Sequence, residues 1–216
     1  MQLSNFIRRV IFSTAFISTF LVFSISIIFQ YINFRNDKVH IKEEFTQIKK
    51  EQIKREVLSV YNVIEQKEEI LINSVKEKLR ERVAQANNLA MSIYNQNKDT
   101  KNPEEIKLLI AKAINNLSYQ NDKTYFFINS NKGQAIIFNK NIELDSYKDV
   151  WNLKDENNNF IIQLQSKIAL ENKEGFLTTT FVKPNSEENK QYSKISFVGL
   201  FEPYNWHIGM GEYLDD

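Results

Sequence analysis

The chain of 216 residues contains no cysteine and little glycine or proline. Without cysteine, disulfide scaffolds, thiol catalysis and Cys-based zinc or iron–sulfur sites are excluded. Five glycines and three prolines are too few for a collagen-like, linker-rich or turn-dense all-β chain. An excess of one charge is lacking too, since 28 Lys and Arg stand against 27 Asp and Glu. Nucleic-acid binding through bulk charge is therefore excluded, and the composition is that of a folded protein.

The apolar residues are concentrated near the N-terminus. Between Arg9 and Arg35 there are 25 residues without a single charge. As a helix rising about 1.5 Å per residue, residues 10–32 would reach about 35 Å, enough to cross a hydrocarbon core of about 30 Å. A cleaved signal peptide is the alternative, but its apolar core is shorter and the small-residue site at 24–26 lies inside this run. The run predicts a retained transmembrane helix over 10–32.

Basic residues give this helix an orientation. Arg8 and Arg9 precede the apolar run, and the positive-inside rule then places residues 1–9 in the cytoplasm. Residues 36–216 lie on the other side of the membrane in this interpretation. They form a polar, extracytoplasmic part.

Residues 36–98 have the pattern of a long amphipathic stalk helix. Glycine and proline are absent, and apolar residues recur at spacings of three and four. A break in the pattern around 66–69 leaves one kinked helix or two abutting helices open. Because so long a helix cannot bury its stripe against a small domain, we expect a parallel homodimer. The stripe consists of Ile41, Phe45, Ile48, Val57, Tyr61, Ile64, Leu71, Val75, Leu79, Val83, Ala86, Ala90 and Ile93.

The remaining part, 103–216, reads as an α+β region. Pro103 with two acidic residues behind it starts a predicted helix over 103–118. From 124 to 213 the apolar period changes to two, which predicts an antiparallel sheet of five strands. A helix over 155–173 interrupts the strands, with Asp155 or Asn159 as its N-cap and Gly175 past its end. The predicted strands cover 124–128, 134–138, 176–183, 192–201 and 206–213.

Lys194 is the main candidate for binding chemistry. It stands in the middle of a strand between apolar neighbours, where a lysine costs free energy unless it is paired or faces water. Aromatic side chains on neighbouring strands would wall a pocket around it, and a small carboxylate would supply the missing charge. A solvent-facing lysine, a lysine paired with a glutamate, and purely structural aromatics remain the alternatives. The candidate ligand-binding residues are Tyr125, Phe127, Phe138, Phe181, Lys194 and Ser196.

Four stretches between 124 and 216 read TYFFIN, KDVWNLKDENNNFIIQL, EGFLTTTFVKP and KISFVGLFEPYNWHIGMGEYLDD. They resemble the single Cache domain, a family of PAS-like extracytoplasmic sensors in bacterial histidine kinases, chemoreceptors and diguanylate cyclases, and the resemblance implies that the predicted five-stranded sheet is PAS-like. The resemblance covers about 54–216, and FEPYNWHIGMGEY is its most specific part. Tyr125 and Phe127 match the family's Y-F-[WF]-I strand. Lys194 and Ser196 match its K-x-S-[YF] strand, whose lysine commonly faces the pocket.

The resemblance implies sensing of a small molecule, with a small organic acid as the expected ligand, and signalling across the bacterial inner membrane. It also implies a second span and a cytoplasmic module after Asp216, such as a histidine kinase or diguanylate cyclase, so this chain itself is not expected to be an enzyme. Where relatives often carry His-Pro, this chain has Phe138 and Asn139, and Phe181 replaces a frequent Trp. The lost histidine removes a hydrogen-bonding group, which leaves the ligand's identity open.

Other chemistry has weak support in the sequence. A Gly-rich phosphate loop, a nucleophile elbow and a metal-binding histidine pair are all absent. His40 and His207 are far apart, and the acidic pairs 155–156 and 215–216 suit capping or surface roles. We therefore expect no catalytic residue, cofactor, metal or nucleic-acid partner. Two other functions stay open: a ligand-free dimerisation or partner-binding module, with a filled sheet face, and an anchored periplasmic hydrolase, with convergent catalytic residues.

Overall fold

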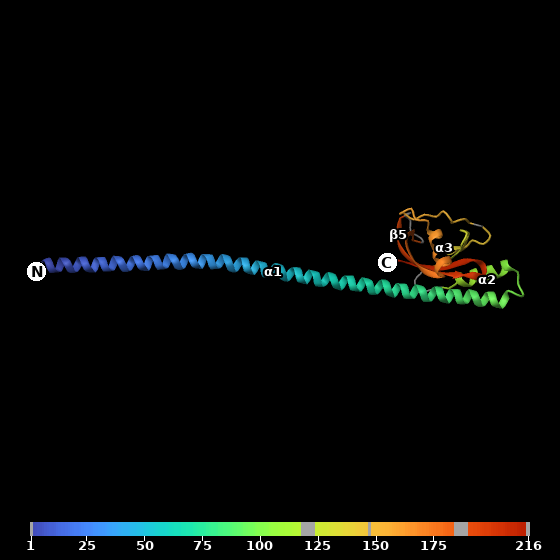
Figure 1. The fold of residues 1–216 in the computed structure, drawn as a ribbon, viewed down its shortest axis with the longest axis horizontal. Coiled ribbons are helices and arrows are strands. Elements are labelled where there is room, and N and C mark those ends of the chain that lie inside the picture. The colour runs from blue at the N-terminus through green and yellow to red at the C-terminus, as the bar shows by residue number, and fades with distance from the viewer. Residues whose placement is uncertain (1, 118–123, 147, 184–189, 215–216) are drawn as a thin grey trace. The chain divides into compact units, whose positions relative to one another are not determined.

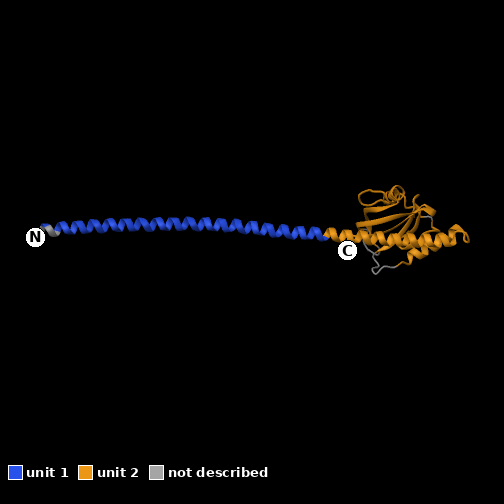
Figure 2. Ribbon diagram, turned by 60° about the horizontal axis from the view of Figure 1, so that its bottom comes forward, with its two compact units in different colours: residues 1–67 blue, residues 68–216 orange. Residues whose placement is uncertain are grey.

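The computed structural model describes residues 2–117, 124–146, 148–183 and 190–214. The predicted link at 184–189, the predicted helix end at 118 and the acidic pair at 215–216 lie outside these ranges. The chain divides into two compact units, Met1–Lys67 and Glu68–Asp216 (Figure 2). Each unit is described by itself below.

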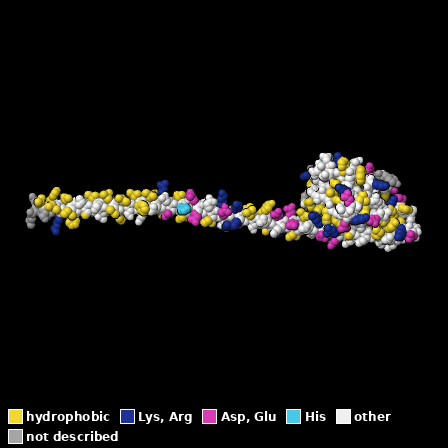
Figure 3. Space-filling view, in the orientation of Figure 1, with side chains coloured by type: hydrophobic (Ala, Val, Ile, Leu, Met, Phe, Trp, Pro, Cys, Tyr) yellow, Lys and Arg dark blue, Asp and Glu magenta, His cyan; other side chains and the backbone are white. Residues whose placement is uncertain are grey.

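The first unit is helical and presents its apolar side chains on the surface (Figure 3). It contains most of α1, Gln2–Asn97, a single helical element where the sequence left one helix or two open. In the apolar run the hydroxyls bond back to their own helix: Ser13 Oγ donates to the carbonyl of Arg9 (2.8 Å) and Thr19 Oγ1 to that of Ala15 (2.6 Å). Within the described residues, this is the one helix long and apolar enough to cross a membrane, judged by length and composition.

The second unit contains the C-terminal part of α1, from residue 68 onward. From Leu79 on the apolar stripe is buried, with Leu79, Val83, Ala86 and Ala90 at most 1% exposed, whereas Leu71 is still 66% exposed. Farther towards the N-terminus the same stripe is open, and Ile48 and Ile64 are each more than half exposed. The sheet of the chain itself therefore covers the later part of the stripe that we expected a second copy to cover.

The sheet has six strands rather than the predicted five. Its order is β3-β2-β1-β6-β5-β4, and all neighbouring strands are antiparallel. The additional strand, β3, has only two residues, too few to show an alternating pattern in the sequence. The last strand, β6, lies inside the sheet between β1 and β5. The strands are β1 (Tyr125–Ser130), β2 (Ala135–Phe138), β3 (Asn141–Ile142), β4 (Glu174–Val182), β5 (Gln191–Phe201) and β6 (Trp206–Tyr213).

One face of the sheet packs against α1 and α2 (Figure 1). Helix α2, Pro103–Asn115, ends before the predicted position 118, and the Asn102 side chain caps it by accepting the Glu105 N–H at 2.9 Å. The sheet contributes apolar residues at alternate positions of its strands. The buried sheet residues of this core include Phe126, Ile128, Ile195, Phe197, Ile208 and Met210.

Helix α3, Ile161–Asn172, lies on the opposite face and starts later than predicted (Figure 1). Asp155 is not its N-cap, because its Oδ1 accepts the N–H groups of Asn157 (2.9 Å) and Asn159 (2.8 Å) in a separate turn. Phe160 occupies the N-cap position instead, without a side-chain hydrogen bond. The left-handed residue at the end is Lys173 (φ 69°), and the predicted stop, Gly175, already belongs to β4.

Candidate ligand-binding site

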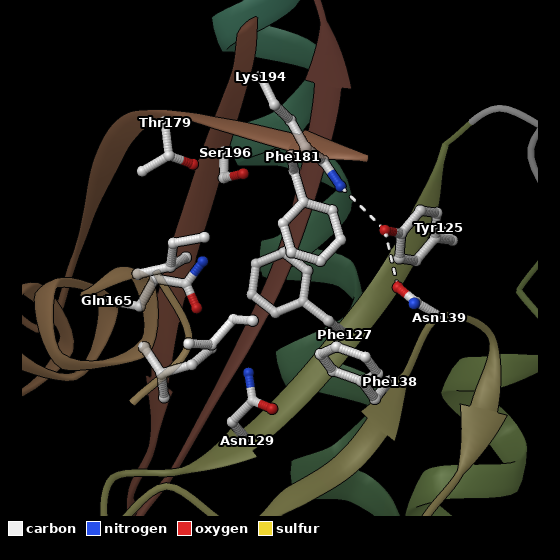
Figure 4. A pocket seen from close by; sticks show the side chains of 13 residues that line it. Tyr125, Phe127, Asn129, Phe138, Asn139, Gln165, Thr179, Phe181, Lys194 and Ser196 are labelled. Atoms are coloured by element: carbon white, nitrogen blue, oxygen red, sulfur yellow. Dashed lines mark hydrogen bonds between the residues drawn. The ribbon is translucent and has the colours of Figure 1, made fainter. Parts of the chain in front are cut away.

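A pocket lies between α3 and the face of the sheet that points away from α1 (Figure 4). Alternate residues of three strands line it, because side chains two apart on a strand share a face. The cavity volume is about 40 Å³, and the wider space of about 420 Å³ between the lining atoms includes the part open to solvent. The lining residues are Tyr125, Phe127, Asn129, Phe138, Asn139, Leu153, Ile161, Ile162, Gln165, Thr179, Phe181, Lys194 and Ser196.

All six residues singled out in the sequence line this pocket, and their role in ligand binding stays a prediction. Asn129 and Gln165 line the pocket but were not predicted from the sequence, and Thr179 was assigned to the strand face of Phe181 without being counted among the candidate residues. Asn129 could have been found, because it continues the alternation of a strand that was recognised. Gln165 gave no such signal, because the residues of a helix that face a pocket depend on how the helix packs.

Lys194 is the one charged side chain among the lining residues, and it is only 4% exposed. Its Nζ donates to the hydroxyl of Tyr125 at 3.2 Å. The ammonium also lies over the rings of Tyr125, Tyr213 and Phe181, at 4.3, 5.0 and 5.3 Å from their centroids. Within the described part of the chain it has no acidic partner. Burial without a counter-charge lowers the pKa of Lys194 to about 7.

Tyr125 connects Lys194 to the loop after β2. Its hydroxyl accepts from Lys194 and donates to Asn139 Oδ1 at 3.4 Å (Figure 4). Burial raises the pKa of Tyr125 to about 12, so the phenol stays neutral. Asn139 has a left-handed backbone (φ 49°), a conformation that asparagine adopts more readily than most residues. One end of the pocket therefore consists of the Lys194 ammonium with the Tyr125 hydroxyl and the Asn139 amide beside it.

A buried histidine lies behind the other end of the pocket. His207 is 0% exposed, and burial lowers its pKa to about 3, so it is neutral. Its Nδ1 lies 2.9 Å from Asn131 Oδ1, and its Nε2 lies 3.3 Å from Asn129 Nδ2. Asn131 Nδ2 in turn donates to Asn205 Oδ1 at 3.0 Å. These bonds hold Asn129 in place against the sheet.

Two glycines of β6 let large pocket side chains lie close to the sheet. A Cβ on Gly209 would come within 2.3 Å of the Phe127 ring, and one on Gly211 within 2.5 Å of Lys194 Cε. Both contacts are far below an ordinary carbon–carbon distance. The glycines therefore give the pocket part of its depth.

A sheet packed on helices at one face, with an aromatic pocket around a single cation at the other, defines an α+β ligand-binding domain. A family model described as Cache domain matches residues 30–216. The chain therefore belongs to the Cache domain family, as the sequence motifs predicted, and the α+β fold class is confirmed as well.

Among known proteins, the methyl-accepting chemotaxis protein McpP of Pseudomonas putida is 29% identical over 104 residues. That match covers 48% of this chain but only 18% of the relative. A solved periplasmic sensor domain of a chemotaxis protein has 24% identity and a TM-score of 0.60, covering 66% of this chain and 96% of its own.

Two further solved structures share the fold. A Cache chemosensory domain solved to explain carboxylic acid recognition has 24% identity and a TM-score of 0.59, covering 67% of this chain and 97% of its own. A methyl-accepting chemotaxis protein of Vibrio parahaemolyticus has 20% identity and a TM-score of 0.56, covering 70% and 96%.

Proposed function

We propose that the chain is the extracytoplasmic sensor part of a bacterial membrane receptor and that it binds a small organic acid. The observation that carries this proposal is Lys194, a buried ammonium that faces a pocket and lacks an acidic partner among the described residues. Membership in the Cache family and the likeness to chemotaxis sensor domains support it. The chain itself has no catalytic role in this proposal.

A carboxylate suits this end of the pocket on charge and geometry. Its oxygens would accept hydrogen bonds from Lys194 Nζ, and charge-assisted bonds of this kind are stronger than neutral ones. The ring faces around Nζ favour a cation but cannot neutralise it. The hydroxyls of Ser196 and Thr179 line the same space and offer further donors. A ligand-free module with a filled sheet face fits poorly, because this face contains a cavity.

The receptor arrangement follows from the apolar helix. Residues 1–9 lie in the cytoplasm, 10–32 cross the inner membrane, and 36–216 lie outside in this proposal. The exposed stripe of α1, which includes Ile48 and Ile64, forms the seam of a parallel homodimer. Ligand binding would shift the equilibrium between two packings of the sheet on α1, and the difference in affinity for the two states would drive the signal.

The ligand proposal is tested by calorimetry on the full chain in lipid nanodiscs, titrated with acetate, propanoate, butanoate and pyruvate. At least one acid should bind, and Lys194→Met should weaken it by about 30-fold or more, because the variant removes the charge and keeps the apolar stem. Lys154→Met is the matched control, since this exposed lysine lies over Phe160, outside the pocket. Equal affinity in wild type and Lys194→Met would overturn the proposal, as would binding of none of these acids.

The homodimer is tested separately by ultracentrifugation of the full chain in detergent. A mass of two chains is expected, and charged substitutions at Ile48 and Ile64 should reduce it to one. A monomer mass for the unaltered chain would refute the dimer without affecting the ligand proposal.

A further inference from the structure

The pocket has a second polar end, formed by two side-chain amides. Asn129 of β1 is 1% exposed and Gln165 of α3 is 4% exposed, and both line the pocket (Figure 4). Asn129 Oδ1 and Gln165 Oε1 have no hydrogen-bond partner in the part of the chain that the structure describes. A buried acceptor that is left unpaired destabilises the fold, because it has lost its hydrogen bonds to water. This end of the pocket therefore favours a molecule that brings a donor.

The hydrogen bonds behind the pocket determine which atom of Asn129 is left unpaired. Asn131 Nδ2 donates to Asn205 Oδ1, and with this amide orientation Asn131 Oδ1 faces His207 Nδ1 at 2.9 Å, which assigns the histidine proton to Nδ1. Neutral His207 then has only a lone pair at Nε2, which accepts from Asn129 Nδ2. Turning the Asn129 amide over would place its oxygen against that lone pair. The unpaired atom is therefore the acceptor Oδ1.

A carboxylate at Lys194 cannot pair with these amide oxygens. An ionised carboxylate only accepts hydrogen bonds, so it offers the amide oxygens nothing. It would also be too far away, because Asn129 is four residues beyond Tyr125, about 13 Å along the strand. On this face of β1, Phe127 stands between Tyr125 and Asn129, and the ring of Phe138 lines the same pocket.

We propose that the ligand is a monocarboxylate that carries an uncharged hydrogen-bond donor, a hydroxyl or an amide N–H, at the end opposite the carboxylate. A hydroxyl shares its one proton between Asn129 Oδ1 and Gln165 Oε1 in a three-centre hydrogen bond, or an amide NH2 gives one proton to each oxygen, while the carboxylate meets Lys194. This inference rests on the proposed function and specifies the class of its ligand.

The charges of the lining narrow the class further. A second carboxylate would place acceptor oxygens against the two amide oxygens, which are acceptors themselves. It would also lack a counter-charge, because Lys194 is the single cation lining the pocket. A terminal ammonium would be buried without any carboxylate among the described lining residues, which is costly. An α-amino group would lie beside the carboxylate, next to the Lys194 ammonium. Dicarboxylates and amino acids should therefore bind more weakly than hydroxy acids.

The inference is tested with matched pairs of acids on the full chain in nanodiscs. The probes are butanoate, hexanoate and octanoate against 4-hydroxybutanoate, 6-hydroxyhexanoate and 8-hydroxyoctanoate. At one chain length or more the hydroxy acid should bind about tenfold more tightly than its parent. Gln165→Met and Asn129→Leu should each reduce that preference below about threefold while the parent acid keeps its affinity.

Ser166→Ala is the matched control. Ser166 is a neighbouring buried residue of α3 whose hydroxyl also has no partner within the described ranges, but it does not line the pocket. The preference for the hydroxy acid should persist in this variant. Tryptophan fluorescence reports folding, and Gln165→Met decides the question should Asn129→Leu fail to fold.

The outcomes separate this inference from the proposed function. If the parent acids bind through Lys194 and the hydroxy acids bind no more tightly at any chain length, only the inference is overturned. A preference that survives in both amide variants would overturn the assignment to these oxygens. Binding of no acid, plain or hydroxylated, would overturn the proposed function and the inference with it.

Discussion

The two faces of the sheet use the same strands for opposite purposes. On β5, Ile195 and Phe197 point to the helices and belong to an apolar core. Their neighbours Lys194 and Ser196 point into the pocket and are just as buried, at 4% and 3% exposed. The helix face gains free energy from every side chain it removes from water. The pocket face gives up part of that gain, because it buries polar groups that a ligand can pair with.

The largest expected effect is on the helix face. Phe197 is 2% exposed and its ring lies 4.6 Å from that of Phe176. Phe197→Ala should lower the free energy of unfolding by about 3–5 kcal/mol and leave carboxylate affinity nearly unchanged. Phe127→Ala borders an existing cavity, so it should cost less stability and more affinity. Denaturant unfolding followed by the fluorescence of Trp151 and Trp206 measures the loss of stability. Equal losses of stability and of carboxylate affinity in Phe197→Ala and Phe127→Ala would contradict the comparison of the two faces.

The next effect is the pH dependence of binding at Lys194. Because burial lowers the pKa of Lys194 to about 7, raising the pH above that value removes the charge that the carboxylate needs. Well above pH 7 the affinity should fall about tenfold per pH unit, and from pH 7 to 9 it should fall about 50-fold, because half of the lysines are already neutral at pH 7. The phenol of Tyr125, with its pKa of about 12, stays neutral throughout.

Calorimetry at several pH values checks this prediction. Lys194→Met should bind weakly and show a flat profile. A flat profile in the unaltered chain would mean that the ammonium is stabilised by something other than the ligand.

A smaller effect concerns His207 and acid stability. Burial lowers the pKa of His207 to about 3, so the unfolded state binds a proton more readily than the folded state below pH 6.5. Stability is therefore fully present above pH 6.5 and falls as the pH drops, by roughly 2 kcal/mol at pH 5. Unfolding curves of wild type and His207→Gln at pH 6.5 and pH 5 isolate this contribution. The same change in the free energy of unfolding in both proteins would show that His207 has the same pKa in the folded and the unfolded state.

The smallest expected effect tests the shape of the pocket. Gly209→Ala would place a Cβ 2.3 Å from the Phe127 ring, which must then move into the pocket. We expect a loss of about 1 kcal/mol in carboxylate binding, roughly fivefold in affinity. Gly175→Ala is the control, because its Cβ would meet Ile168 Cγ2 at 2.7 Å and so introduces a comparable clash outside the pocket lining. Equal affinities in the two variants would argue against a role for Gly209 in pocket depth.

The alternation of residues between the two faces of each strand could be predicted from the sequence, because successive side chains of a strand point to opposite faces. The start of α3 could not be predicted, because the Asp155 turn replaces a helical cap with local hydrogen bonds that no periodicity reveals. The hydrogen bonds around His207 could not be predicted from the sequence either. They join Asn129 and Asn131 to His207, more than 70 positions away, and nothing in the sequence indicates which residues lie beside His207.

The central position of β6 has a consequence for how the domain is made. Its partner β1 is paired through contacts such as Ile128 with Ile208, so the ends of this region must meet before the sheet can close. Pairings this distant in sequence form slowly. Until β6 has joined the sheet, β1 and β5 both keep an open edge, and open edges invite pairing with other chains. We expect truncations that remove β6 to yield aggregates rather than a smaller folded domain.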